Sequence, residues 1–170
     1  MSIVDAEASS FAPLDAALVD RWLAHRNDVS SLAELWGRGV VVDTIEVSAP
    51  WSELTSLCEA ILESLRALTG TVMASVHQSH AYGDGACLYF TFAGVSDDPL
   101  AYYRAAWDRV MPLAMACGAM SHHHGIGRNR ARFVREALGA SYSILEAIKS
   151  ELDPLGILNP GVLALGDDPW

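Results

Sequence analysis

Residues Thr71 to Ala93 read TVMASVHQSHAYGDGACLYFTFA and predict two strands joined by a tight turn. In the first half, the even positions Val72, Ala74 and Val76 are apolar, and Ser75, His77 and Ser79 alternate with them, which is typical of a strand with one buried face. The turn formers Tyr82-Gly83-Asp84-Gly85 follow, and Ala86 to Ala93 forms the second run. The fold is therefore expected to be built around a β-hairpin.

The residues before the hairpin predict a strand and a helix. Val40 to Val47 is β-rich and is stopped by Ser48-Ala49-Pro50, with the proline placed where a first helical turn tolerates it. An amphipathic helix that lies on the sheet is then indicated by apolar residues at helical spacing: Leu54, Leu57, Cys58, Ile61, Leu65 and Leu68.

A second helix and a fourth strand are predicted after the hairpin. Asp98 and Pro99 provide a cap and a first helical position, and Gly118 ends the helix. Ala119 to His123 is expected to form a short strand. The resulting order is the split βαβ arrangement of a ferredoxin-like α+β sandwich, an antiparallel sheet with both helices on one face and the other face bare.

The remaining segments extend this domain, which we place at residues 14–165. Residues 1–13 are expected to be a disordered lead or a linker remnant, and residues 166–170 a tail. Two short helical pieces are predicted around Arg26-Asn27-Asp28. Further helices are expected at Asn129 to Leu138 and at Ser141 to Leu152, followed by strong turn signals.

Composition excludes several classes of function. The net charge is -10, with 11 basic and 21 acidic residues, which argues against nucleic acid and anionic lipid as partners. The chain has an odd number of cysteines without a C-x-x-C spacing, namely Cys58, Cys87 and Cys117. A disulfide framework or a zinc ribbon is therefore not expected. The absence of a long apolar run and of a targeting signal predicts a cytoplasmic location.

Residues that can carry chemistry gather in Ser121 to Arg130, which reads SHHHGIGRNR. The three histidines, with His77 and His80 on a nearby strand, are compatible with a metal site, but packing and hydrogen-bonding histidines at a strand end are the favoured explanation. Gly125-Ile126-Gly127 can bring backbone amides close to an anion, or it is a plain turn before a helix. Tyr82 is a phenol in an exposed turn.

These segments, together with the ending of the chain, resemble those of flavin-linked oxidases of the vanillyl-alcohol-oxidase type. The resemblance is strongest to the alkylglycerone-phosphate synthase branch and covers about residues 15 to 165. It is carried by Glu46-Val47-Ser48-Ala49-Pro50-Trp51, by Tyr82 with Gly85-Ala86-Cys87-Leu88-Tyr89-Phe90, by Ser121 to Gly127, and by Leu152 to Gly161 with its Asn159-Pro160-Gly161 ending.

The resemblance implies the C-terminal, substrate-binding cap of an FAD-dependent enzyme that exchanges acyl for alkyl on a glycerone phosphate through flavin N5. In that family an N-terminal domain holds the FAD, and residues 1–36 cannot be that domain. The chain is therefore expected to be a fragment, a truncated paralogue or one subunit of a split enzyme. It would be inactive without a flavin-binding domain or subunit, and it would take a small-molecule or lipid-like phosphate substrate.

The resemblance also implies roles for individual residues. Tyr82 is similar to the acid/base tyrosine of the family, and His122, His123 and His124 are similar to the histidines beside the flavin ring. Leu88 stands where related 2-hydroxyacid dehydrogenases have a metal-binding histidine, which argues against a metal. The remaining predictions are Gly125, Gly127 and Asn159 for the cofactor and Arg26, Arg128 and Arg130 for the substrate.

Three other functions stay open at this point. The chain could belong to an FAD-linked oxidase that acts on another hydroxy substrate. It could be a non-catalytic binding or dimerisation module in which the bare face of the sheet becomes a protein interface, because an exposed apolar face of that size would have to be covered, and a homo-oligomer would follow from that. A small His-rich metalloprotein is the third alternative.

Overall fold

The computed structural model describes residues 14–28 and 30–166. The predicted lead at residues 1–13 and all but the first residue of the predicted tail lie outside the described residues. The chain divides into two compact units, Met1–Glu34 and Leu35–Trp170. Each unit is described by itself.

The first unit contains helix α2, Ala16–His25, and most of helix α3, Ser30–Trp36. The side chain of Asp15 caps α2 by accepting a hydrogen bond from the amide of Ala17 at 2.9 Å. The two predicted helical pieces are confirmed. Within its unit α2 buries none of its residues, and its apolar side chains, Trp22 among them, are exposed.

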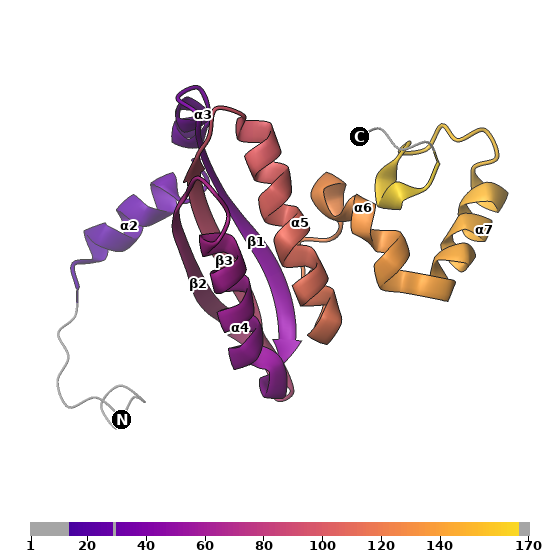
Figure 1. Ribbon diagram of the computed structural model, residues 1–170, viewed down its shortest axis with the longest axis horizontal. Helices are drawn as coiled ribbons and strands as arrows, with labels where there is room; N and C mark the ends of the chain where they lie inside the picture. Colours follow the sequence, from indigo (N-terminus) through magenta and orange to yellow (C-terminus); the bar gives the residue numbers. More distant parts are fainter. Residues whose placement is uncertain (1–13, 29, 167–170) are drawn as a thin grey trace. The chain divides into compact units, whose positions relative to one another are not determined.

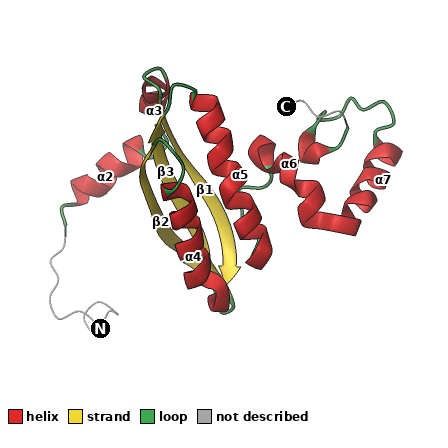
Figure 2. Cartoon of the chain, viewed as in Figure 1, coloured by secondary structure: helices red, strands yellow, loops and turns green. Residues whose placement is uncertain are grey.

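The second unit is organised around an antiparallel sheet formed by β1 (Val40–Pro50), β2 (Thr71–Ala81) and β3 (Gly85–Val95) (Figure 2). The strands lie in the order β1-β3-β2, so β3 is central and the predicted hairpin of β2 and β3 is confirmed. The register of the outer pair places Glu46 of β1 opposite Tyr89 of β3.

Helices α4 (Trp51–Arg66) and α5 (Pro99–Cys117) pack side by side across one face of this sheet (Figure 1). The predicted apolar stripe of α4 faces the strands, and the Asp98 cap of α5 is present, with the amide of Ala101 at 3.0 Å. The predicted α+β sandwich is confirmed. Its core contains Ile45, Leu57, Ile61, Leu65, Phe90, Phe92, Tyr102, Ala106, Trp107, Val110 and Met111.

Two details of the strands differ from the prediction. β1 continues beyond Val47 to Pro50, because Ala49 is buried and Pro50 ends an edge strand, where its missing amide breaks no ladder. Val72 is exposed by 67%, because an irregularity between Thr71 and Met73 shifts the register. Thr71 takes the inward position and its hydroxyl lies 2.8 Å from that of Tyr102.

The predicted fourth strand at Ala119 to His123 is wrong beyond one bridge, which joins Ser48 to Ala119. The chain approaches β1 closely there, since a Cβ on Gly118 would lie 2.1 Å from the carbonyl oxygen of Ser48. Further on, the guanidinium of Arg130 donates hydrogen bonds to the backbone carbonyls of Glu46 and Met120. In a continued ladder these carbonyls would accept from backbone amides of the facing segment. A regular ladder cannot continue past these carbonyls.

The chain ends with the two predicted helices, α6 (Gly127–Leu138) and α7 (Tyr142–Leu152), joined by the 3-10 turn Gly139–Ser141. A last 3-10 turn, Val162–Ala164, is held by Tyr142, whose hydroxyl donates to the carbonyl of Ala164 at 2.5 Å. Apolar side chains on and after α7 are exposed: Ile144, Ile148, Leu152, Leu155, Ile157 and Leu158. None of the helices in the described ranges is long and apolar enough to cross a membrane.

The face of the sheet opposite α4 and α5 is polar around Glu46. Because side chains alternate along a strand, residues of β1 that share a face with Glu46 meet those of β3 that share a face with Tyr89. Around Glu46 this face carries Thr44, Ser48, Ser75, His77, Ser79, Cys87, Tyr89 and Thr91, and toward the other end of the sheet it carries Val42, Met73 and Ala93. The polar part of the open face is therefore the part that lies nearest to Glu46.

Candidate functional site

A fully buried carboxylate, Glu46, forms the centre of the site. It lies on the open face of β1, yet its exposed fraction is 0%, because the segment that follows α5 covers it. We call this segment, Met120–Gly125, the histidine loop. A buried carboxylate requires hydrogen bonds or an opposite charge to offset the loss of hydration, and both are present here.

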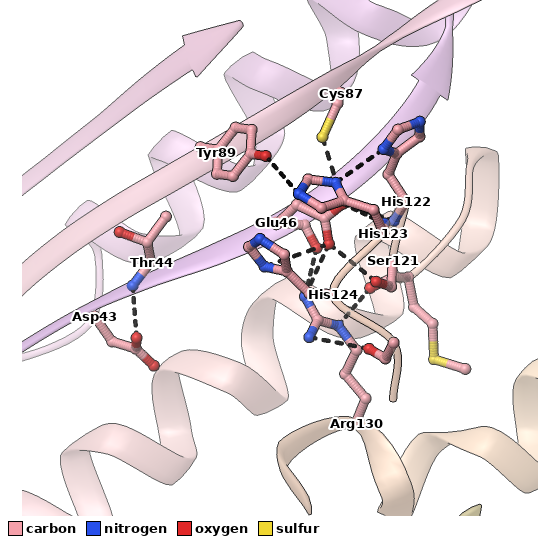
Figure 3. A network of polar contacts seen from close by, with 12 residues as sticks. Asp43, Thr44, Glu46, Cys87, Tyr89, Ser121, His122, His123, His124 and Arg130 are labelled. Carbon is pink, nitrogen blue, oxygen red and sulfur yellow. Dashed lines mark hydrogen bonds and ion pairs between the residues drawn. The ribbon is translucent and has the colours of Figure 1, made fainter. Parts of the chain in front are cut away.

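Oxygen Oε1 of Glu46 holds the backbone of the histidine loop (Figure 3). It accepts hydrogen bonds from the amides of His122 at 2.7 Å and His123 at 3.2 Å, and the thiol of Cys87 donates to it at 3.4 Å. Oε2 accepts a hydrogen bond from the hydroxyl of Ser121 at 3.0 Å. The carboxylate of Glu46 thus accepts the hydrogen bonds of loop amides that would donate to backbone carbonyls if the loop were a fourth strand.

Arg130, in the first turns of α6, holds both ends of the same loop. Its guanidinium donates to the carbonyl of Met120 at 2.6 Å and to that of Gly125 at 3.4 Å. It also donates to the backbone carbonyl of Glu46 at 2.7 Å and lies 3.4 Å from its Oε2. The side chain stacks over Trp107, with 5.1 Å from the guanidinium carbon to the ring centre. The loop is therefore fixed by a buried ion pair.

The pKa of Glu46 is lowered from its ordinary value in spite of burial. Burial by itself raises this pKa, but the hydrogen bonds from the amide of His122, the hydroxyl of Ser121, the thiol of Cys87 and the amide of His123 together outweigh it. The carboxylate therefore stays ionised at neutral pH. It also raises the pKa of the Cys87 thiol to about 11, after the larger effect of burial.

The imidazoles of the histidine loop reach the open face of the sheet. Nε2 of His123 lies 3.2 Å from the hydroxyl of Tyr89, and Nδ1 of His123 lies 2.9 Å from Nδ1 of His122. The side chains of His123 and His124 are exposed by 42% and 46%. Loss of hydration, followed by the charge of His124, lowers the pKa of His123, so that this ring is neutral near pH 7.

Tyr82 and His122 lie together at the end of the hairpin. Their rings are 5.3 Å apart between centres, and the ring of His80 stacks on that of His122 with 5.6 Å between centres. The indole of Trp51 donates to the carbonyl of Tyr82 at 2.9 Å, which fixes the turn. Both Tyr82 and His122 line a cavity of about 390 Å³ beside the ends of β1 and β3, large enough for a small ligand.

A group of donor atoms with metal-ligand spacing exists in this site. Ligand atoms of Glu46, Cys87, His122 and His123 all lie within 4.8 Å of one another. The carboxylate, however, already accepts from two backbone amides and lies beside the charge of Arg130, and its neighbouring thiol is protonated. A cation would have to displace these donors, so the arrangement suits proton chemistry better than metal ligation.

Three of the other predicted site residues, Gly125, Gly127 and Asn159, lie in turns, and Gly125 ends the histidine loop. Gly125 and Gly127 have φ angles of 72° and 54°, and each has open space where a Cβ would be. Their positive φ angles explain the glycines as turn residues. Asn159, with φ 46°, lies in the turn before Val162–Ala164, and Arg26 belongs to the first unit. Their roles toward cofactor and substrate stay predictions.

The predicted substrate arginines differ in their surroundings. Arg130 is exposed by only 6%, and its contacts give it a structural role in addition to the predicted one. Arg128 lines a second cavity, of about 380 Å³, together with Arg104 and Arg132 of the helices and the rings of Trp36 and Tyr103. This cavity shares no lining residue with the one beside Tyr82.

Sequence reasoning assigned no role to Glu46 or Tyr89, which the structure brings together with the histidine loop, and it considered His80 only as part of a possible metal site. A glutamate inside the β-rich run VVVDTIEV is unusual in a strand and was the available signal for Glu46. The alternation of side chains along the strand also places Tyr89 on the open face of the sheet. Neither pattern shows that a loop more than thirty residues away reaches both side chains, since Tyr89 and His123 are 34 residues apart.

Comparison with known proteins agrees with this architecture. Residues 4–163 match the family model of the C-terminal domain of FAD linked oxidases. The alkyldihydroxyacetonephosphate synthase of Caenorhabditis elegans is 36% identical over 131 residues, covering 70% of this chain and 22% of the relative. The uncharacterized FAD-linked oxidoreductase YgcU of Escherichia coli K12 is 26% identical over 166 residues, covering 88% and 34% respectively.

A solved structure of an alkyldihydroxyacetonephosphate synthase shares the fold, with a TM-score of 0.54 and 22% identity over 88% of this chain and 24% of that chain. The chain thus spans between about a fifth and a third of the length of these relatives. The family match covers nearly all of the described residues, including every element of the sandwich and the histidine loop. The chain therefore belongs to the family of FAD-linked oxidase C-terminal domains.

Proposed function

We propose that this chain forms the substrate side of the active site of an FAD-dependent enzyme of the alkylglycerone-phosphate synthase kind, which exchanges an acyl for an alkyl group on a glycerone phosphate. One observation carries the proposal: Tyr82 and His122 share a ligand-sized cavity, and the buried Glu46–Arg130 pair fixes the loop that bears the histidine. Proton transfer to and from a bound substrate needs such pre-positioned groups.

The residues present fit one side of a flavin site. Half-exposed imidazoles at His123 and His124 and the phenol of Tyr82 offer hydrogen-bond donors and acceptors for ring nitrogens and oxygens. The described loop at Gly125–Gly127 is open but offers a single short turn rather than a phosphate-binding loop that follows a strand. The flavin phosphates are thus held by another domain, while this chain contacts the reactive end of the ring.

When bound, FAD supplies the electrophilic centre for the exchange of groups on the glycerone carbon. The tasks of this chain are to bind and orient the substrate and to move protons. Tyr82 holds a proton at its phenol oxygen next to the cavity. His122 lines the same cavity and offers its imidazole to the substrate. Glu46 keeps the loop in place through the amides of His122 and His123.

Arginine is the residue type that we propose for recognition of the phosphate group. Arg128 lies with Arg104 and Arg132 at the second cavity, where Asp108 pairs with Arg132 at 2.7 Å. Because this cavity shares no lining residue with the one beside Tyr82, it suits a more distant part of a lipid-like substrate, with the rings of Trp36 and Tyr103 against an apolar chain. Arg26 is the alternative candidate on the first unit.

The flavin-binding domain would dock on the exposed apolar side chains of α7 and the segment that follows. Six large aliphatic residues there are at least half exposed, namely Ile144, Ile148, Leu152, Leu155, Ile157 and Leu158. A surface of this kind favours burial against a partner. We propose that the domain belongs to the same enzyme, either in a longer chain or as a separate subunit, and that the chain by itself does not turn over.

The test uses absorbance and a chimera. The purified chain mixed with FAD is expected to show no bound flavin, whose bands lie near roughly 370 and 450 nm. A chimera in which this chain replaces the matching segment of the nematode relative is expected to bind flavin and to exchange acyl for alkyl. Tyr82→Phe should keep the flavin bands and lower the exchange at least about 100-fold. Full exchange by Tyr82→Phe would overturn the proposal.

A further inference from the structure

The cavity lined by Arg104, Arg128 and Arg132 lies outside the site built on Glu46. Among the described residues, its lining comes only from α3, α5 and α6, with no residue of a strand or of the histidine loop. Its volume of about 380 Å³ is large enough for a small ligand. We call it the helix cavity. A ligand bound there touches none of the groups that we assign to proton transfer.

The wall of the helix cavity is apolar and uncharged. Ala131 is buried, and the ring of Tyr103 is half-buried and lies edge-to-face against that of Trp36, with 5.6 Å between centres. The hydroxyl of Tyr103 accepts a hydrogen bond from the side chain of Asn129 at 2.5 Å. Burial is the main cause that raises the pKa of Tyr103 to about 12, so the phenol is neutral. This wall can therefore bury an apolar group.

Charged groups gather at the exposed rim of the helix cavity. Three guanidinium groups and one carboxylate line it, in a chain whose net charge is -10. The carboxylate, Asp108, is paired with Arg132, whose Nε and Nη2 donate to its Oδ1 at 3.0 and 2.7 Å.

Arg104 differs from Arg132 in having no such partner. Within residues 14–28 and 30–166, its guanidinium makes no ion pair and no hydrogen bond, and only its backbone carbonyl is engaged, by Arg132 at 3.3 Å. An exposed guanidinium beside an apolar wall suits an anion that carries an apolar group. The helix cavity thus has the two parts that recognition of an anionic amphiphile requires.

The charges of the rim favour a single negative charge on the ligand. Asp108 lies at the same rim and repels an incoming anion, and it repels a dianion about twice as strongly as a monoanion. A planar carboxylate can accept two parallel hydrogen bonds from one guanidinium. Arg104 by itself can therefore satisfy the head group of a carboxylic acid.

We propose that the helix cavity is a second ligand site, which binds a single-chain carboxylic acid with its chain against Trp36 and Tyr103 and its carboxylate at Arg104. Under the function proposed above, the exchange of acyl for alkyl releases such an acid, and this identification rests on that function. Binding of the acid itself does not. The site holds the released acid away from the cavity beside Tyr82.

The isolated chain tests this site without flavin. Titration of the ¹⁵N-labelled protein with octanoate is expected to shift the indole N–H signal of Trp36 and the amide signals of α6 in a saturable manner. 1-Octanol lacks the charge and should bind at least about 5-fold more weakly. Acetate lacks the chain and should cause no saturable shift. Octyl phosphate compares the two head groups, and tighter binding than that of octanoate would overturn the choice of a carboxylate.

Two variants separate the head group from the chain. Arg104→Met keeps the length of the side chain and removes its charge, and it should weaken octanoate about 3- to 10-fold while the affinity for 1-octanol is retained. Arg109→Met is the matched control, because this exposed arginine lies on the same helix and does not line the cavity. It should bind octanoate as the unaltered chain does.

Two further results would overturn the site. One is an octanoate affinity that Arg104→Met does not change, and the other is a set of shifts confined to α7 and the apolar segment after it. Neither result bears on the exchange reaction, which the Tyr82→Phe chimera tests. Conversely, full exchange by that chimera would overturn the proposed function and leave the binding of octanoate at Arg104 standing.

Discussion

The guanidinium of Arg130 donates to the backbone carbonyl of Glu46 at 2.7 Å, at the point where a fourth strand would have continued the sheet. The same arginine pairs with the carboxylate of Glu46 and holds the carbonyls of Met120 and Gly125. One side chain thus replaces several ladder hydrogen bonds. The consequence is that the histidine loop depends on a buried ion pair rather than on sheet pairing.

Removing the cation should therefore be costly. Arg130→Met leaves the buried carboxylate of Glu46 without its partner, and we expect a loss of about 3–5 kcal/mol in the free energy of unfolding. The measurement is urea denaturation followed by circular dichroism at pH 7. Arg132→Met is the matched control on the same helix, because its exposed pair with Asp108 should contribute less than about 1 kcal/mol. Equal losses in the two variants would contradict the role given to Arg130.

The double variant Glu46→Gln with Arg130→Met separates charge from packing. If the cost of Arg130→Met comes from an unpaired buried charge, removing that charge as well should recover part of the lost stability. A double variant less stable than Arg130→Met alone would show instead that the hydrogen bonds of the carboxylate to the histidine loop dominate.

Stability should fall in acid because Glu46 has a lowered pKa. A carboxyl group whose folded pKa lies below its unfolded value stabilises the fold above the unfolded value, and this contribution is lost as the pH falls toward the folded pKa. Its ordinary value is 4.5, so the loss should begin below about pH 5 and grow as the pH falls further. Urea midpoints measured from pH 7 to pH 3 test this, and the slope should be shallower in Glu46→Gln. An unchanged slope would assign the acid sensitivity to other carboxyl groups.

The secondary structure could be predicted where periodicity is a local property. The stripe Leu57, Ile61 and Leu65 follows the helical period, and all three residues face the sheet. The hairpin is equally local, since its turn residues lie between two apolar runs. Val72 fits the alternating pattern but is exposed, because a register shift at one position cannot be recognised from the pattern.

The site was only half predictable for a related reason. The histidines and Tyr82 are conspicuous in the sequence, and a resemblance to a family pointed at them. Glu46 and Tyr89 are ordinary strand residues until the fold brings them to the histidine loop, 76 and 34 residues further along the chain. The fourth strand failed as a prediction because Arg130, a residue of a later helix, takes the hydrogen bonds it needed.

Cys87 should be inert toward thiol reagents in the folded protein. Its side chain is fully buried, and burial, the hydrogen bond to Glu46 and the charge of that carboxylate raise its pKa to about 11. Since the thiolate is the reactive form, iodoacetamide at pH 8 should modify Cys87 only after unfolding. Peptide mass mapping of samples treated with and without urea provides the measurement. Cys58, which is partly exposed, is the internal comparison, and modification of Cys87 before Cys58 would contradict the buried geometry.

The turn after α7 should depend on Asp153. Its carboxylate accepts hydrogen bonds from the amides of Ile157 at 3.0 Å and Leu158 at 2.9 Å, and it pairs with Lys149. The hydrogen bond from Lys149, followed by those of the two amides, lowers the pKa of Asp153 from its ordinary 3.8 in spite of the loss of hydration. The group is therefore charged at neutral pH and holds the chain where it leaves the helix.

Asp153→Asn keeps the shape of the side chain but removes its charge and one acceptor oxygen. Amide hydrogen exchange of Ile157 and Leu158 should then become about 5- to 30-fold faster, because their hydrogen bonds to a charged group are weakened or lost. Exchange within β3 should not change, because Asp153 contacts no residue of the sheet among its described hydrogen bonds and ion pairs. If the apolar surface after α7 docks on a flavin-binding domain, the variant should also weaken flavin uptake by the chimera, since the exposed Ile157 and Leu158 follow this turn directly. Protection at Ile157 and Leu158 equal to that of the unaltered chain would show that the turn holds without Asp153.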